Sequence, residues 1–308
     1  MTNTQFSSSG MRVLVTGAGG FLGRHVTAGL LAKGAQVTAL LRHIVPLQSG
    51  VAGIEVLDLE TGDIGALLRR VGPDVILHCA GLIAAPDDED GRARLMRANY
   101  TVTDRLLHAA RSLPQPPRVV LVSSAAIWAP MVPGQGAITE EHPMRPVAAY
   151  GVSKAAATLL GLAMNARGDL PVAVGVPFNV IGPGQPARLV PQVFIDQLRA
   201  NPDQIILNDP GVIRDWIDVR DVASALILLA HPDVPPDLYN IATGRGLSLG
   251  AMAQAVCAQG GWHPSMPTPS HPAASGVARS IGSSARLQRV CGWRADIPLD
   301  ETLVDMLQ

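Results

Sequence analysis

The sequence lacks a surplus of charge of either sign. Its 308 residues include 24 Lys and Arg against 25 Asp and Glu, which gives a formal net charge of -1. A chain so close to neutrality has no overall field that would gather nucleic acid or an anionic membrane surface, so we expect neither as a partner. Any anionic ligand must be held by local groups.

Cysteine is scarce, and long apolar runs are missing. The three cysteines, Cys79, Cys257 and Cys291, are far apart and show no CxxC spacing, which argues against a metal site and fits a reducing compartment. No run of about 18 apolar residues could cross a membrane, and residues 1–10 lack the basic start and apolar core of a secretion signal. The sequence therefore predicts a cytoplasmic protein with a flexible polar leader over residues 1–10.

Hydrophobic residues, by contrast, make up 47% of the chain, enough to bury a large core. They form short runs typical of strands, which alternate with segments of helical spacing. The strands are expected at residues 12–16, 36–41, 54–57, 74–78 and 118–122, and the helices at residues 21–33, 63–70 and 100–112. Such alternation indicates an α/β fold with a doubly wound parallel sheet, because each crossover lays a helix against the sheet.

The pattern changes after Val180. The run Gly182-Pro-Gly-Gln-Pro186 breaks the chain, a helix is expected near residues 192–199, and prolines are frequent between residues 232 and 272. We therefore expect one domain at residues 11–180 and a smaller C-terminal substrate-binding lobe at residues 181–308, interleaved with the last sheet elements.

A glycine-rich turn joins the first strand to the first helix, in the run Thr16-Gly-Ala-Gly-Gly-Phe-Leu-Gly23. In this context backbone N–H groups and the positive end of the helix can receive a pyrophosphate. Gly17 would permit the tight turn, Gly20 would let phosphates approach, and Gly23 would let helix and strand pack closely. The turn makes residues 11–180 a candidate dinucleotide-binding domain, although a packed turn can need such glycines without a ligand.

The end of the second strand bears on the choice of dinucleotide. An enzyme that prefers NAD usually has an acidic residue there, which binds the ribose 2′-hydroxyl. Here the strand ends Leu40-Leu-Arg-His43, and the guanidinium of Arg42 suits a 2′-phosphate. We therefore favour NADP(H) over NAD(H), which stays possible if Arg42 is only a solvated loop residue.

Three further residues are candidates for a proton-transfer site. Tyr150 and Lys154 lie one turn apart on the same face of an alanine-rich helix. A nearby ammonium and a nicotinamide cation favour the ionised phenol and bring Tyr150 within reach of proton transfer. Ser124 follows a strand at the edge where open parallel sheets bind ligands, so its hydroxyl could donate to a substrate oxygen.

With these residues the chain resembles the extended short-chain dehydrogenases/reductases that act on nucleotide sugars. The resemblance runs from Met11 to the C-terminus. Its motifs are Thr16-Gly-Ala-Gly-Gly-Phe-Leu-Gly23, Asp58-Leu59, His78-Cys-Ala-Gly81, Asn99, Val122-Ser-Ser124, Tyr150-Gly-Val-Ser-Lys154, Asn179-Val-Ile-Gly-Pro-Gly184 and Arg214-Asp-Trp-Ile-Asp-Val-Arg-Asp221. It implies a Rossmann-type fold and a homodimer formed through the helices at residues 100–112 and 150–166.

The resemblance also implies roles for individual residues. Ser124 would polarise the substrate carbonyl, Tyr150 would be the acid or base, and Lys154 would bind the ribose hydroxyls and lower the pKa of Tyr150. Asn179 and Arg214 would contact the substrate diphosphate. The cofactor would lie against Gly17, Gly20, Phe21, Leu22, Gly23, Arg42, Asp58, Leu59, Ala80, Gly81, Asn99, Tyr150, Lys154 and Pro177.

Within the family, dehydration is disfavoured because Ala125 and Ala126 follow Ser124 where similar 4,6-dehydratases carry an Asp-Glu pair. The run Pro177-Phe-Asn-Val-Ile-Gly-Pro-Gly-Gln185 and the C-terminal residues are most similar to GDP-4-keto-6-deoxymannose reductases. Four features depart from that pattern, namely Val176, Trp128, Ala285-Arg286, and the segment 270–280 with Arg279 as its one basic residue.

We therefore predict an NAD(P)H-dependent reductase that transfers a hydride to a ketone, with a nucleotide-activated 4-keto-6-deoxy sugar as the leading substrate and Tyr150 as the proton donor. An epimerase with tightly bound NAD is the first alternative. A non-catalytic dinucleotide-sensing protein is the second, and the Ser124, Tyr150 and Lys154 set argues against it.

Overall fold

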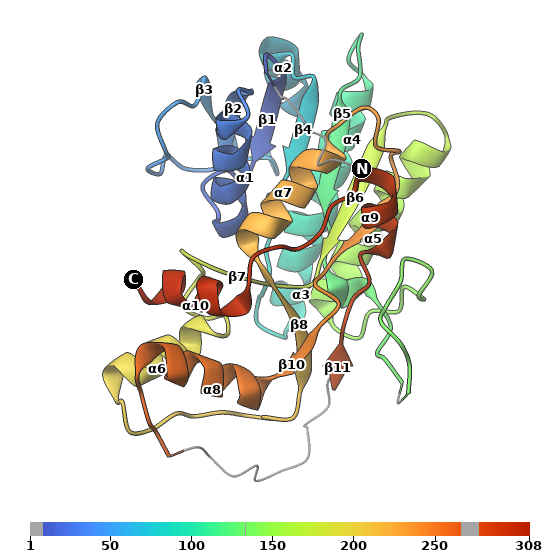
Figure 1. Cartoon of the computed structure of the whole chain (residues 1–308). Helices are drawn as coiled ribbons and strands as arrows, with labels where there is room; N and C mark the ends of the chain where they lie inside the picture. Colours follow the sequence, from blue (N-terminus) through green and yellow to red (C-terminus); the bar gives the residue numbers. More distant parts are fainter. Residues whose placement is uncertain (1–8, 133, 266–276) are drawn as a thin grey trace.

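A computed structural model describes residues 9–132, 134–265 and 277–308. Seven parallel strands form its main sheet, in the order β3-β2-β1-β4-β5-β6-β9 (Figure 1). Their bounds are β1 Arg12–Thr16, β2 Gln36–Leu41, β3 Gly53–Val56, β4 Val75–His78, β5 Arg118–Val122, β6 Val172–Pro177 and β9 Leu238–Ile241. This order confirms the doubly wound α/β fold, in which ligands bind where the strand order reverses, between β1 and β4.

Helices cover both faces of this sheet. On one face α1 packs against α7, and on the other α2 and α5 both contact α4. The bounds are α1 Phe21–Ala32, α2 Ile64–Val71, α4 Val102–Arg111, α5 Ala149–Ala166 and α7 Val219–Leu229. A parallel sheet enclosed in this way buries both faces of its central strands, which explains why several of them, such as β4 and β5, are mostly apolar.

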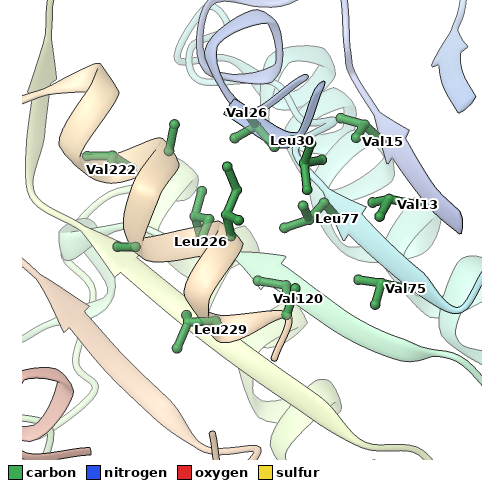
Figure 2. Packing of buried hydrophobic residues seen from close by; sticks show 14 of the residues in the cluster. Val13, Val15, Val26, Leu30, Val75, Leu77, Val120, Val222, Leu226 and Leu229 are labelled. Atoms are coloured by element: carbon green, nitrogen blue, oxygen red, sulfur yellow. The ribbon is translucent and has the colours of Figure 1, made fainter. Parts of the chain in front are cut away.

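Alternation along β1 divides the core into two layers. Val13 and Val15 pack with α1 and α7, whereas Leu14 between them packs on the opposite face. Figure 2 shows the first layer, where Val26 and Leu30 of α1 lie against strand residues such as Leu77 of β4. Fully burying a side chain of this size stabilises the fold by about 1.5–3 kcal/mol.

The helix expected at residues 100–112 begins earlier. Helical structure runs from α3, Glu89–Met96, through a π-helical turn at Arg97–Thr101 and into α4. The start is capped by Asp88, whose carboxylate accepts a 2.7 Å hydrogen bond from Gly91 N. The missed segment is charged, with Gly91 and Leu95 its buried residues, so it has little apolar periodicity. Other expected elements differ by one or two residues at their ends.

Elements after residue 180 contribute to two sheets. The second sheet is centred on β8, which pairs with β7, β10 and β11. Helices α6, α8 and α10 pack together beside it, at the end of the main sheet opposite α2 (Figure 1). The bounds are β7 Asn179–Ile181, α6 Gln192–Ala200, β8 Ile213–Asp218, β10 Gly246–Ser248, α8 Leu249–Gly260, β11 Arg279–Ser280, α9 Ala285–Cys291 and α10 Leu299–Leu307.

The predicted leader is described only at its end. Residues 1–8 lie outside the described residues, and Gly10 N donates to the carbonyl of Gly34, which attaches that residue to the fold. None of the helices in the described part of the chain has the length and apolar character needed to cross a membrane.

Candidate functional site

The glycine turn lies at the strand-order reversal. Gly17 has φ +68°, and a Cβ built on it would lie 2.7 Å from Ala80 N at the end of β4, so the two strand ends approach too closely for a side chain. A Cβ on Gly23 would lie 2.1 Å from Gly17 O. Helix α1 begins at Phe21 with no side-chain cap and no acidic residue in its first turn. Its first N–H groups therefore remain open to an anion.

A cleft of about 520 Å³ opens beside this turn. It collects residues that follow four neighbouring strands of the main sheet, β3, β2, β1 and β4. Of the predicted cofactor residues, its lining includes Gly17, Gly20, Arg42, Asp58, Leu59, Ala80 and Gly81. The free N–H groups, the absent side chains and the cleft volume together fit a dinucleotide.

Arg105 of α4 holds the loop after β3, which lines the cleft, in place. Its guanidinium donates to Leu59 O at 2.6 Å and to Gly62 O at 2.8 Å, so α4 fixes the loop that carries Asp58. One Asp58 oxygen accepts from Glu60 N at 2.8 Å. The other carboxylate oxygen is thus available to a donor such as an adenine amine.

Ser124 and Tyr150 meet at the carboxyl edge of the sheet. Ser124 lies two residues beyond β5 and caps the 3-10 turn at Ala125–Ile127, accepting from Ala126 N at 3.2 Å. Burial raises the pKa of Tyr150, and a side-chain hydrogen bond with Ser124 lowers it in part. Tyr150 therefore keeps its proton at neutral pH in the ligand-free chain.

Lys154 lies beside the same strand end. Its Nζ donates to Val122 O at 2.6 Å, and burial lowers its pKa to about 8. A Cβ on Gly81 would lie 3.7 Å from Nζ, which places the ammonium at the cleft wall. Lys154 was expected to lower the pKa of Tyr150. In the structure, burial raises that pKa and the hydrogen bond with Ser124 lowers it in part, and Lys154 is not among the groups that shift it.

Asn99 acts on the site through other residues. It is buried in the π-helical turn, where its amide exchanges two hydrogen bonds with the backbone of Leu82, at 2.8 and 2.9 Å, and donates to Ser153 Oγ at 2.9 Å. These bonds tie the segment after β4 to helix α5. Because both N–H donors of its amide are paired, Asn99 supports the cleft indirectly, through Leu82 of the lining and Ser153 of α5.

The predicted substrate contacts lie in the second sheet. Asn179 pairs with Trp216, and Arg214 lies two residues from Trp216 on β8, so Asn179 and Arg214 point to the same side of that sheet. Arg214 Nη1 donates to the carbonyl of Ile213, and burial lowers the pKa of Arg214. Among the described residues its guanidinium has no carboxylate partner, which suits an anionic ligand.

Comparison with known proteins identifies the family. Residues 13–242 match the model of the NAD dependent epimerase/dehydratase family. The chain belongs to this family. It is an NAD(P)-dependent oxidoreductase of the extended short-chain dehydrogenase/reductase type.

The relatives of this chain differ from one another in activity. It is 32% identical to a dTDP-6-deoxy-L-talose 4-dehydrogenase (NAD(P)(+)) from Kitasatospora kifunensis, over 76% of this chain and 74% of that protein. It is 30% identical to a GDP-6-deoxy-D-mannose reductase from Pseudomonas aeruginosa, over 95% and 94%. Its fold matches MoeE5 in complex with UDP-glucose and NAD with a TM-score of 0.83, 30% identity and coverage of 96% and 97%.

The structure of this family member adds cleft residues that the sequence did not indicate. The helical run from α3 through the π-helical turn to α4 brings Arg94, Arg97, Ala98 and Val102 to the cleft lining. An Asp at the cap, acidic residues in the first turn and Arg94 in the last turn are helix-end signals that could have located α3.

Other predicted site residues lie outside the cleft lining. Phe21, Leu22 and Gly23 form the first turn of α1, and Pro177 ends β6. In the segment 270–280, residues 270–276 lie outside the described residues, and Arg279 is exposed in β11 beside β8. In the described part of the chain no group of three or more His, Cys, Asp or Glu residues could hold a metal ion.

Proposed function

We propose that this enzyme reduces the 4-keto group of a nucleotide-activated 6-deoxy sugar with NAD(P)H, with Tyr150 as the proton donor. The observation that carries the proposal is the side-chain hydrogen bond between Ser124 and Tyr150 beyond the end of β5, together with Lys154, whose Nζ lies next to Gly81 of the cleft lining. The bound coenzyme would supply the hydride. Ser124 would donate to the carbonyl oxygen, and Tyr150 would protonate that oxygen as negative charge develops.

The protonation state of Tyr150 favours reduction. A proton donor must carry its proton before the step, and burial raises the pKa of Tyr150. Lys154, which remains largely protonated at neutral pH, would stabilise the phenolate left behind and bind ribose hydroxyls when it leaves Val122 O. Dehydration would need groups that move protons at two neighbouring carbons, and Ala125 and Ala126 offer none.

A nucleotide sugar is supported by Asn179 and Arg214, which share one side of the second sheet and could contact a diphosphate. The activities of the two relatives, a 4-dehydrogenase and a reductase of 6-deoxy sugars, support the 6-deoxy class. Val176, Trp128 and Ala285-Arg286 differ from the pattern of GDP-4-keto-6-deoxymannose reductases. The proposal therefore includes both GDP and dTDP as the nucleotide.

NADP(H) is the proposed coenzyme because Arg42 is exposed at the end of β2 and lines the cleft. We propose that its guanidinium binds the 2′-phosphate. The three cysteines are free thiols, typical of a reducing compartment, and we place the reaction in the cytoplasm.

A homodimer is proposed through α5. The exposed residues of this helix include Val152 and Leu159, two turns apart on one face, and both are large and apolar. The outward residues of α4 are more polar, with an ion pair between His108 and Asp104. Sedimentation of the enzyme and of a Leu159→Glu variant would test this interface, since the variant should be monomeric.

The decisive experiment measures coenzyme and turnover together. Absorbance at the nicotinamide band is recorded for the purified enzyme, and then consumption of added NADPH or NADH is followed with GDP- and dTDP-linked 4-keto-6-deoxy sugars and with simple ketones. Stoichiometric consumption with an alcohol product would support the reductase. Tightly bound NAD, with interconversion of two sugars and no net consumption, would establish the epimerase instead.

A further inference from the structure

The cofactor cleft has a second basic wall, formed by Arg94 and Arg97. Arg94 lies in the last turn of α3 and Arg97 is the first residue of the π-helical turn. Both line the same cleft as Gly17 and Gly20 of the glycine turn. Together with Arg42 they give the lining three guanidinium groups against the carboxylates of Asp58 and Glu60.

These two arginines differ from the other arginines of the same helical segment. Arg92 pairs with Asp87, Arg105 donates to the loop carbonyls described above, and Arg111 pairs with Asp169. The side chains of Arg94 and Arg97 make no hydrogen bond or ion pair within the described ranges, even though carboxylates line the same cleft.

Arg94 and Arg97 are both exposed, and helix stability does not account for their placement. A cation in the last turn of a helix usually stabilises its carboxyl end, but α3 continues directly into the π-helical turn with right-handed helical geometry at Arg97. The helix therefore has no free end at Arg94. π-Helical turns occur frequently at functional sites, and here the turn at Arg97–Thr101 contributes Arg97 and Ala98 to the cleft lining, next to Arg94 of α3 and Val102 of α4.

We infer that Arg94 and Arg97 bind a phosphate group of the dinucleotide coenzyme. The helix N-terminus at Phe21 would receive phosphate oxygens from one side, and the two guanidinium groups would receive them from the other side as charged donors. The ligand chemistry is a phosphate, either the pyrophosphate common to both coenzymes or the 2′-phosphate of NADPH. This inference rests on the assigned use of a nicotinamide dinucleotide.

The test is direct coenzyme binding, without sugar substrate. Dissociation constants for NADPH and NADH are measured by isothermal titration for the wild type, Arg94→Ala, Arg97→Ala and the double variant. Arg92→Ala is the matched control, because Arg92 is on the same helix but outside the cleft lining. Thermal unfolding verifies that each variant is folded.

We expect the double variant to bind at least about ten-fold more weakly, since hydrogen bonds to charged groups are involved, and Arg92→Ala to bind like the wild type. An equal loss for NADPH and NADH would assign the arginines to the pyrophosphate, and a loss confined to NADPH would assign them to the 2′-phosphate. Unchanged binding by a folded double variant, or an equal loss in Arg92→Ala, would overturn the inference. A wild type that binds neither coenzyme would instead overturn the proposed function.

Discussion

The Thr16 hydroxyl and Nδ1 of His78 share a 2.7 Å hydrogen bond that joins the ends of β1 and β4. The other ring nitrogen, Nε2, lies 3.1 Å from Thr103 Oγ1, and that hydroxyl donates its own proton to Asn99 O. Thr103 can therefore only accept from His78, which fixes the neutral tautomer with the proton on Nε2. The buried His78 thus connects the strand of the glycine turn to the π-helical turn of the cleft.

Replacing His78 should change how stability depends on pH. Burial, and to a lesser extent the charge of Lys154, lowers the pKa of His78 from 6.5 to about 3. Between these values the unfolded chain binds the proton and the folded chain does not, so stability falls as pH falls below 6.5, by up to about 1.4 kcal/mol per pH unit. In His78→Gln this contribution should vanish, while stability at pH 8 falls by about 1–3 kcal/mol because a threonine hydroxyl loses its partner.

The measurement is urea unfolding of wild type and His78→Gln between pH 5 and 8, with the exposed His108→Gln as the control. A stability difference between wild type and His78→Gln that stays constant across this range would contradict the neutral, buried state of His78.

Replacing Tyr150 should separate chemistry from coenzyme binding. Tyr150→Phe keeps the ring but removes the hydroxyl that is proposed to donate the proton. Turnover should fall by a factor of about 100 to 10,000, the range for a positioned acid, while the dissociation constant for NADPH stays within about two-fold. Stopped-flow reduction and fluorescence titration would measure the two quantities, with Tyr100→Phe as the control. Unchanged turnover would show that Tyr150 is not the proton donor, whereas unchanged biological activity of the variant would support the non-catalytic alternative.

Replacing Arg42 should change the choice of coenzyme. In Arg42→Ala the affinity for NADPH should fall by about ten-fold or more, because a phosphate loses a charged donor. The affinity for NADH provides the internal control and should hold, since NADH has no 2′-phosphate. Equal losses for both coenzymes would assign Arg42 to the pyrophosphate or the adenine and would remove the argument for NADP(H).

The sequence predicted those parts of the fold that local pattern determines. The first five strands are short, mostly apolar runs bounded by turns. The spacing of the glycines after the first strand predicted the turn between β1 and α1. Helix α3 was missed because it buries few residues, and Arg94 and Arg97 were missed with it. Strand β6 was not assigned, although its residues are all buried, because a short apolar run after the helix at residues 150–166 has no periodicity of its own.

Contacts between distant segments could not be predicted in the same way. The partners of His78 are Thr16, 62 residues earlier, and Thr103, 25 residues later. The Asp215 carboxylate likewise depends on Thr243 and Gly282, which the fold brings together. One sequence contains no local signal for such pairs, because each residue alone is compatible with a solvated loop.

A methyl group at Gly23 should destabilise the enzyme. A Cβ there would lie 2.1 Å from Gly17 O, and that carbonyl cannot move without the turn beside it. We expect Gly23→Ala to lower the free energy of unfolding by about 1–3 kcal/mol, as in overpacked cores, and to weaken NADPH binding. Gly136→Ala is the control, since a Cβ at Gly136 meets nothing within 4 Å. Equal stability of the two variants in denaturant unfolding would contradict the close packing.

Asp215 should matter for the substrate side of the enzyme and not for the coenzyme side. It is fully buried in β8, next to Arg214. One oxygen accepts from Thr243 N and Oγ1, at 2.9 and 2.6 Å, and the other accepts from Gly244 N and Gly282 N, at 2.9 and 3.2 Å. The carboxylate thus joins the segments that follow β9 and β11 to the second sheet.

In Asp215→Asn an NH2 group must face donors that now have no acceptor, so the free energy of unfolding should fall by about 1–3 kcal/mol. The KM for the sugar should rise because Arg214 and its sheet lose their support, while the dissociation constant for NADPH stays within about two-fold, since the cleft lies between β1 and β4. Asp237→Asn is the matched control, because Asp237 is half exposed and its ion pair with Arg286 contributes about 0–1 kcal/mol. If steady-state kinetics and thermal unfolding find the two variants alike, the buried carboxylate does not organise the substrate side.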